Sequence, residues 1–514
     1  MNKKIITFGE APLVIEDIIS LAQGSALASL SNTDEYNQKI KAGVDYLHAL
    51  LTKEGEIYGV TTGYGDSCTV GVPLNRVHEL PINLMRFHGC GLGDVFSEEE
   101  SAAILAARLA SLTQGYSGVT PELLSLLVLL LNKRVLPIIP QEGSVGASGD
   151  LTPLSYVAAV LMGEREVWYQ GQRLPTVDVF EQLNIRSICL QPKEGLAIMN
   201  GTAVMTALAC LAYSRATYLS KLTTRITAMM SIALGGNPYH FAEGLFAVKP
   251  HQGQNQIAAW LRADLAVADK HDTEKRLQDR YSLRCAPHVI GVLQDALPWF
   301  RQFIETELNS ANDNPIVDGI NERIYHGGHF YGGHIAFAMD SMKQAIANLA
   351  DLLDRQIALI MDTKFNQGLP ANLSAATSSH AMINHGLKAV QIGASAWTAE
   401  ALKLTMPASV FSRSTECHNQ DKVSMGTIAA RDCLRVLQLT EQVAAAGLLA
   451  VRQAIGIRHQ QKDTDDSTLT FRVQEMYEAL TEDVEFIVED RPLETELRSL
   501  TLAIQKQKWC LYEA

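Results

Sequence analysis

Residues 346–360 read IANLADLLDRQIALI, and this stretch indicates the class of fold most directly. Its apolar residues recur at steps of three and four: Ile346, Leu349, Leu353, Ile357 and Ile360. Such spacing places them on one face of an α-helix. Residues 434–455 continue in the same way, with many alanines that allow neighbouring helices to approach closely. The two stretches predict long bundle helices that also pair with other subunits.

Outside these helices the chain changes character near residue 195. Residues 1–195 mix short elements with turn residues, whereas amphipathic helical patterns dominate residues 196–514. Strands are too few for a doubly wound sheet. We therefore expect a mainly α fold, in which a mixed head domain over residues 1–195 precedes a long-helix bundle and C-terminal helical region over residues 196–514.

Local signals predict several individual elements. Helices are expected over three ranges: 35–52, 98–114 and 121–133. The last of them has Thr120 as its N-cap and Pro121 at its first position. Hairpins are expected over residues 167–174 and 316–325.

Composition narrows the classes of function. The chain has 514 residues, of which 47% are hydrophobic and 19% charged, and its net charge is −13 with no basic run. A large core is available, whereas binding to a nucleic-acid backbone or an anionic membrane surface is not expected. The uncharged stretch 195–214 is long enough to raise the question of a membrane span, but its alanines and threonines favour a buried helix.

The cysteines argue against a metal or redox centre. Eight are scattered along the chain, and no two have Cys-x-x-Cys spacing. We expect buried thiols and no metal site. No apolar stretch of signal-peptide length precedes Glu10, so the cytoplasm is the expected compartment.

The glycine-rich stretch GSVGASGDLTPL, residues 143–154, carries the chemistry. Such a loop before a helix, here one that Thr152 would cap and Pro153 would open, is ordinarily a tight turn. The inner triplet Ala147-Ser148-Gly149 allows more, because glycine lets its amide nitrogen fold back onto the Ala147 carbonyl. Ring closure and loss of two waters, the second from Ser148, would give 4-methylidene-imidazol-5-one. No standard side chain supplies such an electrophile.

Four further motifs follow one another along the chain: IYGVTTGYG at 57–65, MNGT at 199–202, QDRYSLRC at 278–285 and NDNP at 312–315. Together with the glycine-rich stretch, they make the chain resemble the aromatic amino-acid ammonia-lyase family over nearly its whole length. That family includes histidine, phenylalanine and tyrosine ammonia-lyases. The resemblance implies a mostly helical homotetramer whose active sites combine residues of three subunits. It also implies that Ala147-Ser148-Gly149 matures autocatalytically into the prosthetic group, with no metal or external cofactor.

The resemblance also assigns roles to residues that, taken singly, are more often ordinary polar or core side chains. Tyr58 is the implied base, since a phenolate can remove a weakly acidic β-proton. Arg284 would bind the substrate carboxylate in a two-pronged contact. The other implied residues hold the carboxylate or the prosthetic-group oxygen, polarise the electrophile or line the site: Gly65, Asn200, Gln278, Tyr281, Asn312 and Phe330.

Two positions bear on the substrate. In the NLMRFHG stretch at 83–89 the family places ring selectivity on Phe87-His88. By this resemblance, histidine lyases have Ser-His at these two positions, phenylalanine lyases have Phe-Leu and many tyrosine lyases have His-Leu. Some tyrosine lyases also have Ser-His. Histidine lyases typically have a glutamate where this chain has Gln420, and a neutral amide suits an imidazole less well. Phe87 offers an aromatic wall and His88 a polar group for a phenolic hydroxyl, so L-tyrosine is favoured, with trans-p-coumarate as product.

Other functions stay open. L-Phenylalanine is accepted equally well if His88 only hydrogen-bonds within the pocket wall, and histidine is a further alternative. An aromatic 2,3-aminomutase of the same family would use the same prosthetic group and re-add ammonia to the β-carbon; sequence motifs barely separate it from a lyase. The intact Tyr58, Arg284 and Ala-Ser-Gly triplet argue against a catalytically silent scaffold.

Overall fold

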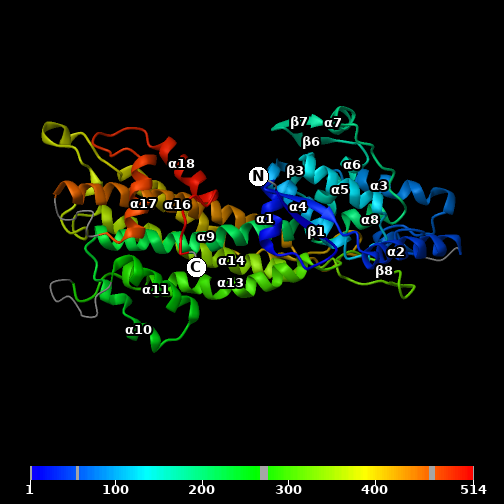
Figure 1. The fold of residues 1–514 in the computed structure, drawn as a ribbon, viewed down its shortest axis with the longest axis horizontal. Coiled ribbons are helices and arrows are strands. Elements are labelled where there is room, and N and C mark those ends of the chain that lie inside the picture. Colours follow the sequence, from blue (N-terminus) through cyan, green and yellow to red (C-terminus); the bar gives the residue numbers. More distant parts are fainter. Residues whose placement is uncertain (1–2, 54–56, 267–275, 462–468, 513–514) are drawn as a thin grey trace. The chain divides into compact units, whose positions relative to one another are not determined.

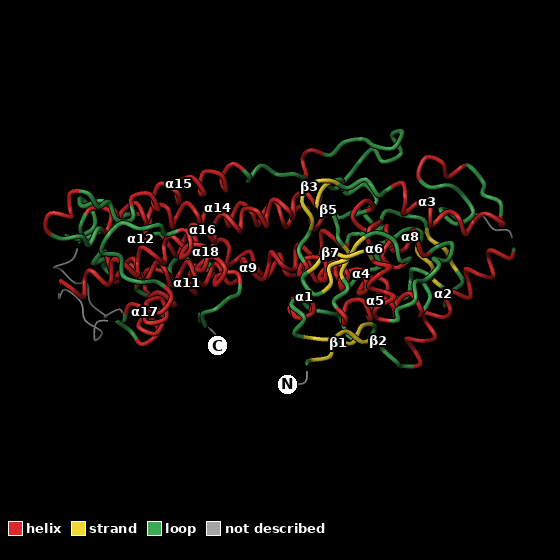
Figure 2. Tube along the Cα trace, turned by 90° about the horizontal axis from the view of Figure 1, so that it is seen from above, coloured by secondary structure: helices red, strands yellow, loops and turns green. Residues whose placement is uncertain are grey.

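The computed structural model describes residues 3–53, 57–266, 276–461 and 469–512, and these are mostly helical with little sheet (Figure 2). The expected mainly α fold is confirmed. The chain forms two compact units, each from three segments. Unit 1 consists of Met1–Ser214, Phe300–Asp340 and Pro407–Arg431. Unit 2 consists of Arg215–Trp299, Ser341–Met406 and Asp432–Ala514.

These units differ from the single boundary predicted near residue 195. Four long helices begin in one unit and end in the other: α9 (Ala203–Ala233), α13 (Ala286–Leu308), α14 (Gly333–Met361) and α16 (Gly426–Gln461). An amphipathic pattern continues along a helix whatever its apolar face packs against. The sequence pattern therefore does not indicate where along these helices one packing unit ends.

Within the described residues, unit 1 contains the strands and eight helices that lie wholly within it (Figure 1). Its helices are α1 (Ile15–Ala22), α2 (Asp34–Thr52), α3 (Leu80–Phe87), α4 (Glu98–Leu112), α5 (Pro121–Lys133), α6 (Leu151–Leu161), α7 (Thr176–Leu183) and α8 (Glu194–Met199), with the 3₁₀ turns η1 (Gly65–Thr69), η2 (Leu74–Glu79) and η6 (Ser409–Phe411). Strands β1 (Lys4–Phe8) and β2 (Ala26–Leu30) pair in parallel. The antiparallel sheets are β3 (Leu92–Val95) with β5 (Pro140–Glu142), β4 (Leu136–Pro137) with β6 (Glu166–Tyr169) and β7 (Gln172–Pro175), and β8 (Ile316–Asp318) with β9 (Arg323–Tyr325).

The local signals in this unit are confirmed. The expected helices appear as α2, α4 and α5, and the Thr120 hydroxyl accepts a hydrogen bond from the Leu123 amide at the start of α5. Both expected hairpins form, as β6–β7 and β8–β9. Gln170 and Gly171 join β6 to β7 with φ of 52° and 74°, the left-handed pair that a two-residue hairpin turn requires.

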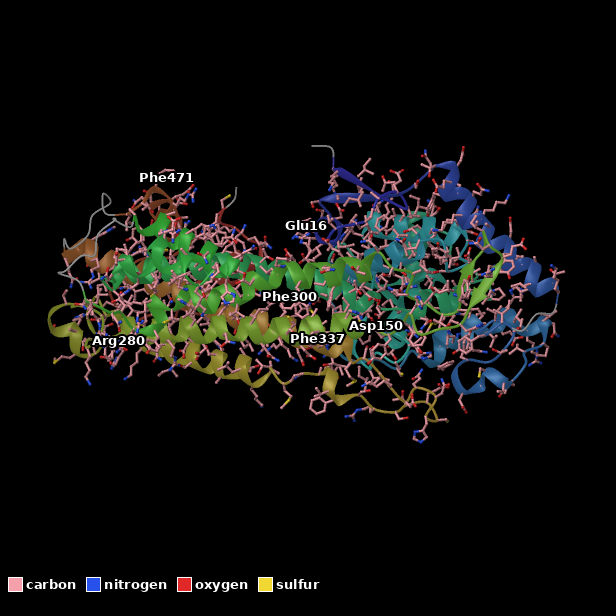
Figure 3. The ribbon with its side chains drawn as sticks, turned by 90° about the horizontal axis from the view of Figure 1, so that it is seen from below. Glu16, Asp150, Arg280, Phe300, Phe337 and Phe471 are labelled. Carbon is pink, nitrogen blue, oxygen red and sulfur yellow. The ribbon has the colours of Figure 1, made fainter. Side chains whose placement is uncertain are left out.

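The helix after the glycine-rich stretch begins earlier than predicted. Helix α6 starts at Leu151, so Asp150 and not Thr152 is its N-cap residue, and Pro153 lies inside its first turn. The fully buried Asp150 carboxylate (Figure 3) does not cap α6. It accepts hydrogen bonds from the backbone amides of Val204 and Met205, at 3.1 and 3.0 Å, at the start of α9. The expectation that Thr152 caps the helix was wrong: the helix begins one residue before Thr152, and the Asp150 side chain binds the start of a helix that begins 53 residues after it.

Unit 2 is the helical bundle. Its own helices are α10 (Glu243–Ala247), α11 (Gln252–Leu265), α12 (Tyr281–Arg284), α15 (Lys388–Lys403), α17 (Phe471–Asp483) and α18 (Glu494–Gln505), with the 3₁₀ turns η3 (Pro238–Phe241), η4 (Ala371–Leu373) and η5 (Ser378–Met382). The five residues that defined the apolar face at 346–360 are all fully buried, which confirms that face.

The uncharged stretch 195–214 is buried almost throughout, as predicted, although it spans α8 and the start of α9 and not one helix. In the described part of the chain one helix, α16, is long and apolar enough to cross a bilayer, and 83% of its most apolar window is buried inside the protein.

The expectation of buried thiols was wrong for most cysteines. Cys210 in α9 and Cys433 in α16 are buried, and Cys285 is half-buried. The other five are exposed, and all lie outside the α-helices: Cys68, Cys90, Cys189, Cys417 and Cys510. Loop positions have no apolar periodicity from which burial can be read.

Candidate active site

The Ala147-Ser148-Gly149 triplet lies between β5 and α6 and is held against the MNGT motif. Gly149 has φ of +70°, and a Cβ there would lie 2.1 Å from the Gly201 carbonyl oxygen, so the position requires glycine. The two glycines form a parallel β-bridge, and the Asp150 amide donates to the Gly201 oxygen at 2.8 Å. The backbone of the triplet is therefore fixed by direct contact with the backbone of residues 199–202.

Two amide side chains contact Ser148. Asn200, which is 1% exposed, donates from Nδ2 to the Ser148 carbonyl oxygen at 2.7 Å. Gln420 donates from Nε2 to the Ser148 hydroxyl at 3.3 Å, and its Oε1 accepts from the Thr415 hydroxyl at 2.8 Å. Within the described residues, the buried Oδ1 of Asn200 has no hydrogen-bond partner.

These contacts fit the ring chemistry expected of the triplet. If the Gly149 nitrogen joined the Ala147 carbonyl carbon, the Ser148 carbonyl oxygen would become the oxygen of the imidazolone, and Asn200 already donates a hydrogen bond to it. The Ser148 hydroxyl, which would leave as water, is the group that Gln420 contacts. Asn200 is therefore the side chain that would hold the oxygen of the methylidene-imidazolone, whereas Gln420 lies beside the hydroxyl that would leave.

Buried charges surround the glycine contact. The Lys193 ammonium and the Asp313 carboxylate lie 2.7 Å apart, and both side chains are almost completely buried. Arg108 is fully buried, and burial lowers its pKa to about 10. Asn312 accepts from Arg108 Nη1 at 3.0 Å and donates to the Thr202 hydroxyl at 2.8 Å. Its side chain is thus occupied in holding the loop that precedes β8 to the MNGT motif.

Tyr58 is held by a backbone donor. Its phenolic oxygen accepts a hydrogen bond from the Gly65 amide at 2.8 Å. Burial raises the pKa of Tyr58, the Gly65 hydrogen bond opposes the rise, and the negative charge of Glu416 adds to it. A donor aimed at the phenolic oxygen stabilises the phenolate, the form that a base requires.

Glu416 is the acidic side chain that the sequence reasoning missed. It accepts from the Asp66 amide at 2.8 Å, and a Cβ on Gly65, whose φ is +60°, would overlap its carboxylate. The signal was present in the sequence, because Glu416 precedes Gln420 by four residues.

The Phe87-His88 pair lies at the end of α3. The two rings are 4.3 Å apart between centroids and tilted by 36°. His88 Nδ1 lies 3.0 Å from the Leu84 carbonyl oxygen. Burial lowers the pKa of His88, against the opposing effects of that carbonyl and of Glu416. His88 is therefore neutral near pH 7, and a carbonyl can only accept, so Nδ1 carries the proton and Nε2 is a free acceptor.

The remaining expected residues make none of the contacts described above. Phe330 is half-buried between β9 and α14 in unit 1. Gln278, Tyr281 and Arg284 belong to unit 2. There Arg284 Nη2 lies 3.4 Å from Gln278 Oε1, and its guanidinium lies over the Tyr281 ring at 4.7 Å. The structure thus groups Tyr58 with Gly65 and Glu416, Ser148 with Asn200 and Gln420, and the three residues of unit 2 with one another.

The family model described as aromatic amino acid lyase matches residues 13–482. The chain belongs to the aromatic amino acid lyase family. It is 37% identical over 463 residues to histidine ammonia-lyase of Geobacillus sp. (strain WCH70), covering 90% of this chain and 89% of that protein.

Solved structures agree with this membership. Tyrosine aminomutase of Streptomyces globisporus is 33% identical, with a TM-score of 0.90 over 99% of this chain and 97% of that one. Phenylalanine aminomutase of Pantoea agglomerans is 29% identical, with a TM-score of 0.90 over 98% of this chain and 99% of that one.

Membership in the aromatic amino acid lyases makes this protein an enzyme, a carbon–nitrogen lyase, and confirms the resemblance read from the five motifs. The relatives carry names for three amino acids and two reaction outcomes, so membership alone does not select a substrate. Among the described residues, no group of three or more His, Cys, Asp or Glu side chains is arranged to hold a metal ion.

Proposed function

We propose that this enzyme eliminates ammonia non-oxidatively from an aromatic L-amino acid, with L-tyrosine as preferred substrate and trans-p-coumarate as product. The observation that carries the choice of tyrosine is the hydrogen bond between His88 Nδ1 and the Leu84 carbonyl. Because this bond fixes the tautomer, Nε2 can accept a hydrogen bond but cannot donate one. A phenolic hydroxyl is a donor that satisfies it, whereas the ring of phenylalanine leaves it unpaired.

Histidine is the second candidate. It is favoured by the names of the curated relatives and by the Glu416 carboxylate, which can accept an imidazole N–H and whose charge opposes the lowering of the His88 pKa by burial. Against it, the carboxylate already accepts from the Asp66 amide and from Asn419 Nδ2, each at 2.8 Å. The neutral Gln420, bonded to Ser148 and Thr415, provides no replacement charge.

An aminomutase outcome is the third candidate, favoured by the two solved structures with that name. A mutase must retain the released ammonia until it adds again at the β-carbon, and a lyase releases it. Analysis of products distinguishes the two directly, because a mutase yields a β-amino acid.

The side chains divide the reaction between them. When formed from residues 147–149, the methylidene-imidazolone supplies an electron-poor alkene. Tyr58, as phenolate, takes the β-proton, and the Gly65 N–H stabilises its negative charge. Arg284 binds the substrate carboxylate, with Gln278 beside it. Asn200 holds the Ser148 oxygen and so polarises the ring.

We propose further that the enzyme acts as a homotetramer whose active sites are completed by residues of neighbouring subunits. Tyr281 is 72% exposed and Phe87 is 59% exposed in the single chain. Aromatic walls of a substrate site are ordinarily covered, so a second copy is expected to cover them.

One set of incubations tests the proposal. Purified enzyme is given L-tyrosine, L-phenylalanine or L-histidine separately, and products are identified by chromatography and mass spectrometry. We expect p-coumarate from tyrosine at the highest kcat/KM, and an intact protein mass lower by two waters. Urocanate as the main product would establish histidine, and β-tyrosine would establish the mutase. An unmodified mass would refute the prosthetic group.

A further inference from the structure

Asp279, next to Gln278 in unit 2, makes three hydrogen bonds, of which one is to Arg284 and two are to the segment around His240. Its backbone amide donates to His240 Nε2 at 2.9 Å. Its carboxylate accepts from the Asn237 amide at 2.7 Å. Its backbone carbonyl accepts from Arg284 Nε at 2.9 Å. One residue therefore joins the turn at 237–241 to the guanidinium of Arg284.

His240 lies in η3, the 3₁₀ turn that follows α9. Asn237 caps this turn by accepting from the Tyr239 amide at 3.1 Å. The side chains of His240 and Asp279 are only 14% and 11% exposed. A backbone amide can only donate, so His240 Nε2 is the acceptor, and the neutral ring carries its proton on Nδ1.

These contacts determine how Arg284 is presented. With its amide bound to His240 and its carboxylate to Asn237, Asp279 has one orientation, and its carbonyl then has one direction. That carbonyl binds the Nε side of Arg284. The edge formed by the two terminal nitrogens then faces a ligand, and it can bind a carboxylate in a two-pronged contact, although Nη2 also donates to Gln278 Oε1 at 3.4 Å.

We propose that His240 is a positioning residue for the substrate carboxylate: through Asp279 it aims the guanidinium of Arg284. The inference rests on the proposed function, in which Arg284 binds that carboxylate. His240 does not touch substrate in this assignment. Its effect should appear in ligand affinity and not in the chemical step.

The QDRYSLRC motif at residues 278–285 makes other contacts with the bundle. Loss of the His240 contact should therefore shift Arg284 without detaching the whole motif. Gln356 Nε2 donates to the Ser282 carbonyl at 2.8 Å. The Arg280 guanidinium (Figure 3) lies over the Phe365 ring at 4.1 Å. Residues 280–282 therefore keep their attachment to the bundle when the His240 contact is removed.

The test compares His240→Leu, which removes the acceptor, with His240→Gln, whose Oε1 can replace Nε2. We expect His240→Leu to raise KM for the amino acid at least tenfold and to change kcat less than threefold. His240→Gln should restore KM to within threefold of the parent. The matched control is His48→Leu on the exposed side of α2, where the histidine ring has no partner among the described residues, and it should leave both constants unchanged.

Inhibitors separate a positioning role from general damage. Inhibition constants are measured for trans-cinnamate, which carries a carboxylate, and for 2-phenylethylamine, which does not. His240→Leu should weaken cinnamate at least tenfold and phenylethylamine less than threefold. In an Arg284→Ala background, His240→Leu should have no further effect on cinnamate, because the two residues act through one contact. If His240→Leu does not fold, His240→Asn, whose amide is shorter, replaces it with the same expectations.

Equal weakening of both inhibitors, additive effects in the double variant, or an unchanged KM would overturn the assignment of His240. Failure of the proposed function looks different. In that case the parent enzyme itself forms no product from any aromatic amino acid, and Arg284→Ala leaves cinnamate binding unchanged.

Discussion

His88→Leu is the substitution that tests the choice of substrate most sharply. In the parent, Nδ1 is bound to the Leu84 carbonyl and Nε2 is left as an acceptor. Leucine removes that acceptor and keeps an apolar wall beside Phe87. The variant then has Phe-Leu at residues 87 and 88, the pair that is typical of phenylalanine lyases.

The size of the effect follows from two contributions. A net hydrogen bond from a phenolic hydroxyl is worth about 1 kcal/mol, and leaving a buried acceptor unpaired costs about 1–3 kcal/mol. Leucine abolishes the first contribution for tyrosine and the second for phenylalanine. His88 is only half-buried in the single chain, so solvent reduces the effect below the sum of the two contributions, which is about 2–4 kcal/mol. We expect the ratio of kcat/KM for tyrosine over phenylalanine to fall at least about tenfold, or roughly 1.4 kcal/mol.

The assay is the initial rate of formation of p-coumarate and cinnamate, measured separately over a range of substrate concentrations at one pH. His78→Leu provides the control. His78 lies in η2, just before the motif at residues 83–89, where its side chain is exposed and has no partner among the described residues. The control should leave the ratio within twofold of the parent. An unchanged ratio in His88→Leu, with both rates reduced equally, would show that His88 does not bind the ring hydroxyl, and the assignment of tyrosine would then be withdrawn.

Three other perturbations have defined outcomes. Ser148→Ala should leave a folded oligomer with no lyase activity, because alanine has no hydroxyl to lose; substantial turnover, measured with pure variant, would exclude the prosthetic group. Because the pKa of Tyr58 is raised, its phenolate fraction grows towards alkaline pH, and kcat/KM should increase with it. Glu416→Gln removes a negative charge that raises this pKa, so the acid limb of the kcat/KM profile should move to lower pH. A move to higher pH would contradict the assignment of Tyr58 as the base. Asp150→Ala removes the acceptor for two backbone amides and for the hydroxyls of Ser144 and Thr427. It should lower the free energy of unfolding, measured by denaturant titration, by about 3 kcal/mol. A decrease of less than about 1 kcal/mol would mean that water replaces these contacts.

What the sequence predicted and what it missed differ by the range of the interaction. Helices α2, α4 and α5 and both hairpins follow from residues within a few positions of one another. The partners of Asp150 are 54 and 55 residues away at the start of α9, so propensity at the start of α6 pointed to Thr152 instead. Glu416 contacts residues that precede it by 350 positions, and only a three-dimensional structure brings them together.

The site residues divide in the same way. The resemblance carried Tyr58 and Asn200 to positions where each has a hydrogen bond that suits its expected role. For Asn312 the outcome differs, because its side chain is hydrogen-bonded to Arg108, Ser111 and Thr202. These contacts favour a structural role for Asn312 over contact with the substrate. A motif gives the residue type at a position, but the partners that occupy its atoms come from other parts of the chain.

The buried charges around Gly201 suit the cyclisation that we propose for residues 147–149. A buried ion pair such as Lys193–Asp313 adds little net stability, but removing one partner leaves an uncompensated charge, so the pair strongly specifies one arrangement. Arg108 and Asn312 lie against Gly201, which in turn faces Gly149. The cyclisation proposed for residues 147–149 has no external catalyst, so its rate depends on how closely the backbone is held to the reacting geometry. A polar interior with one permitted arrangement supplies that constraint, whereas apolar packing of the same volume tolerates small shifts.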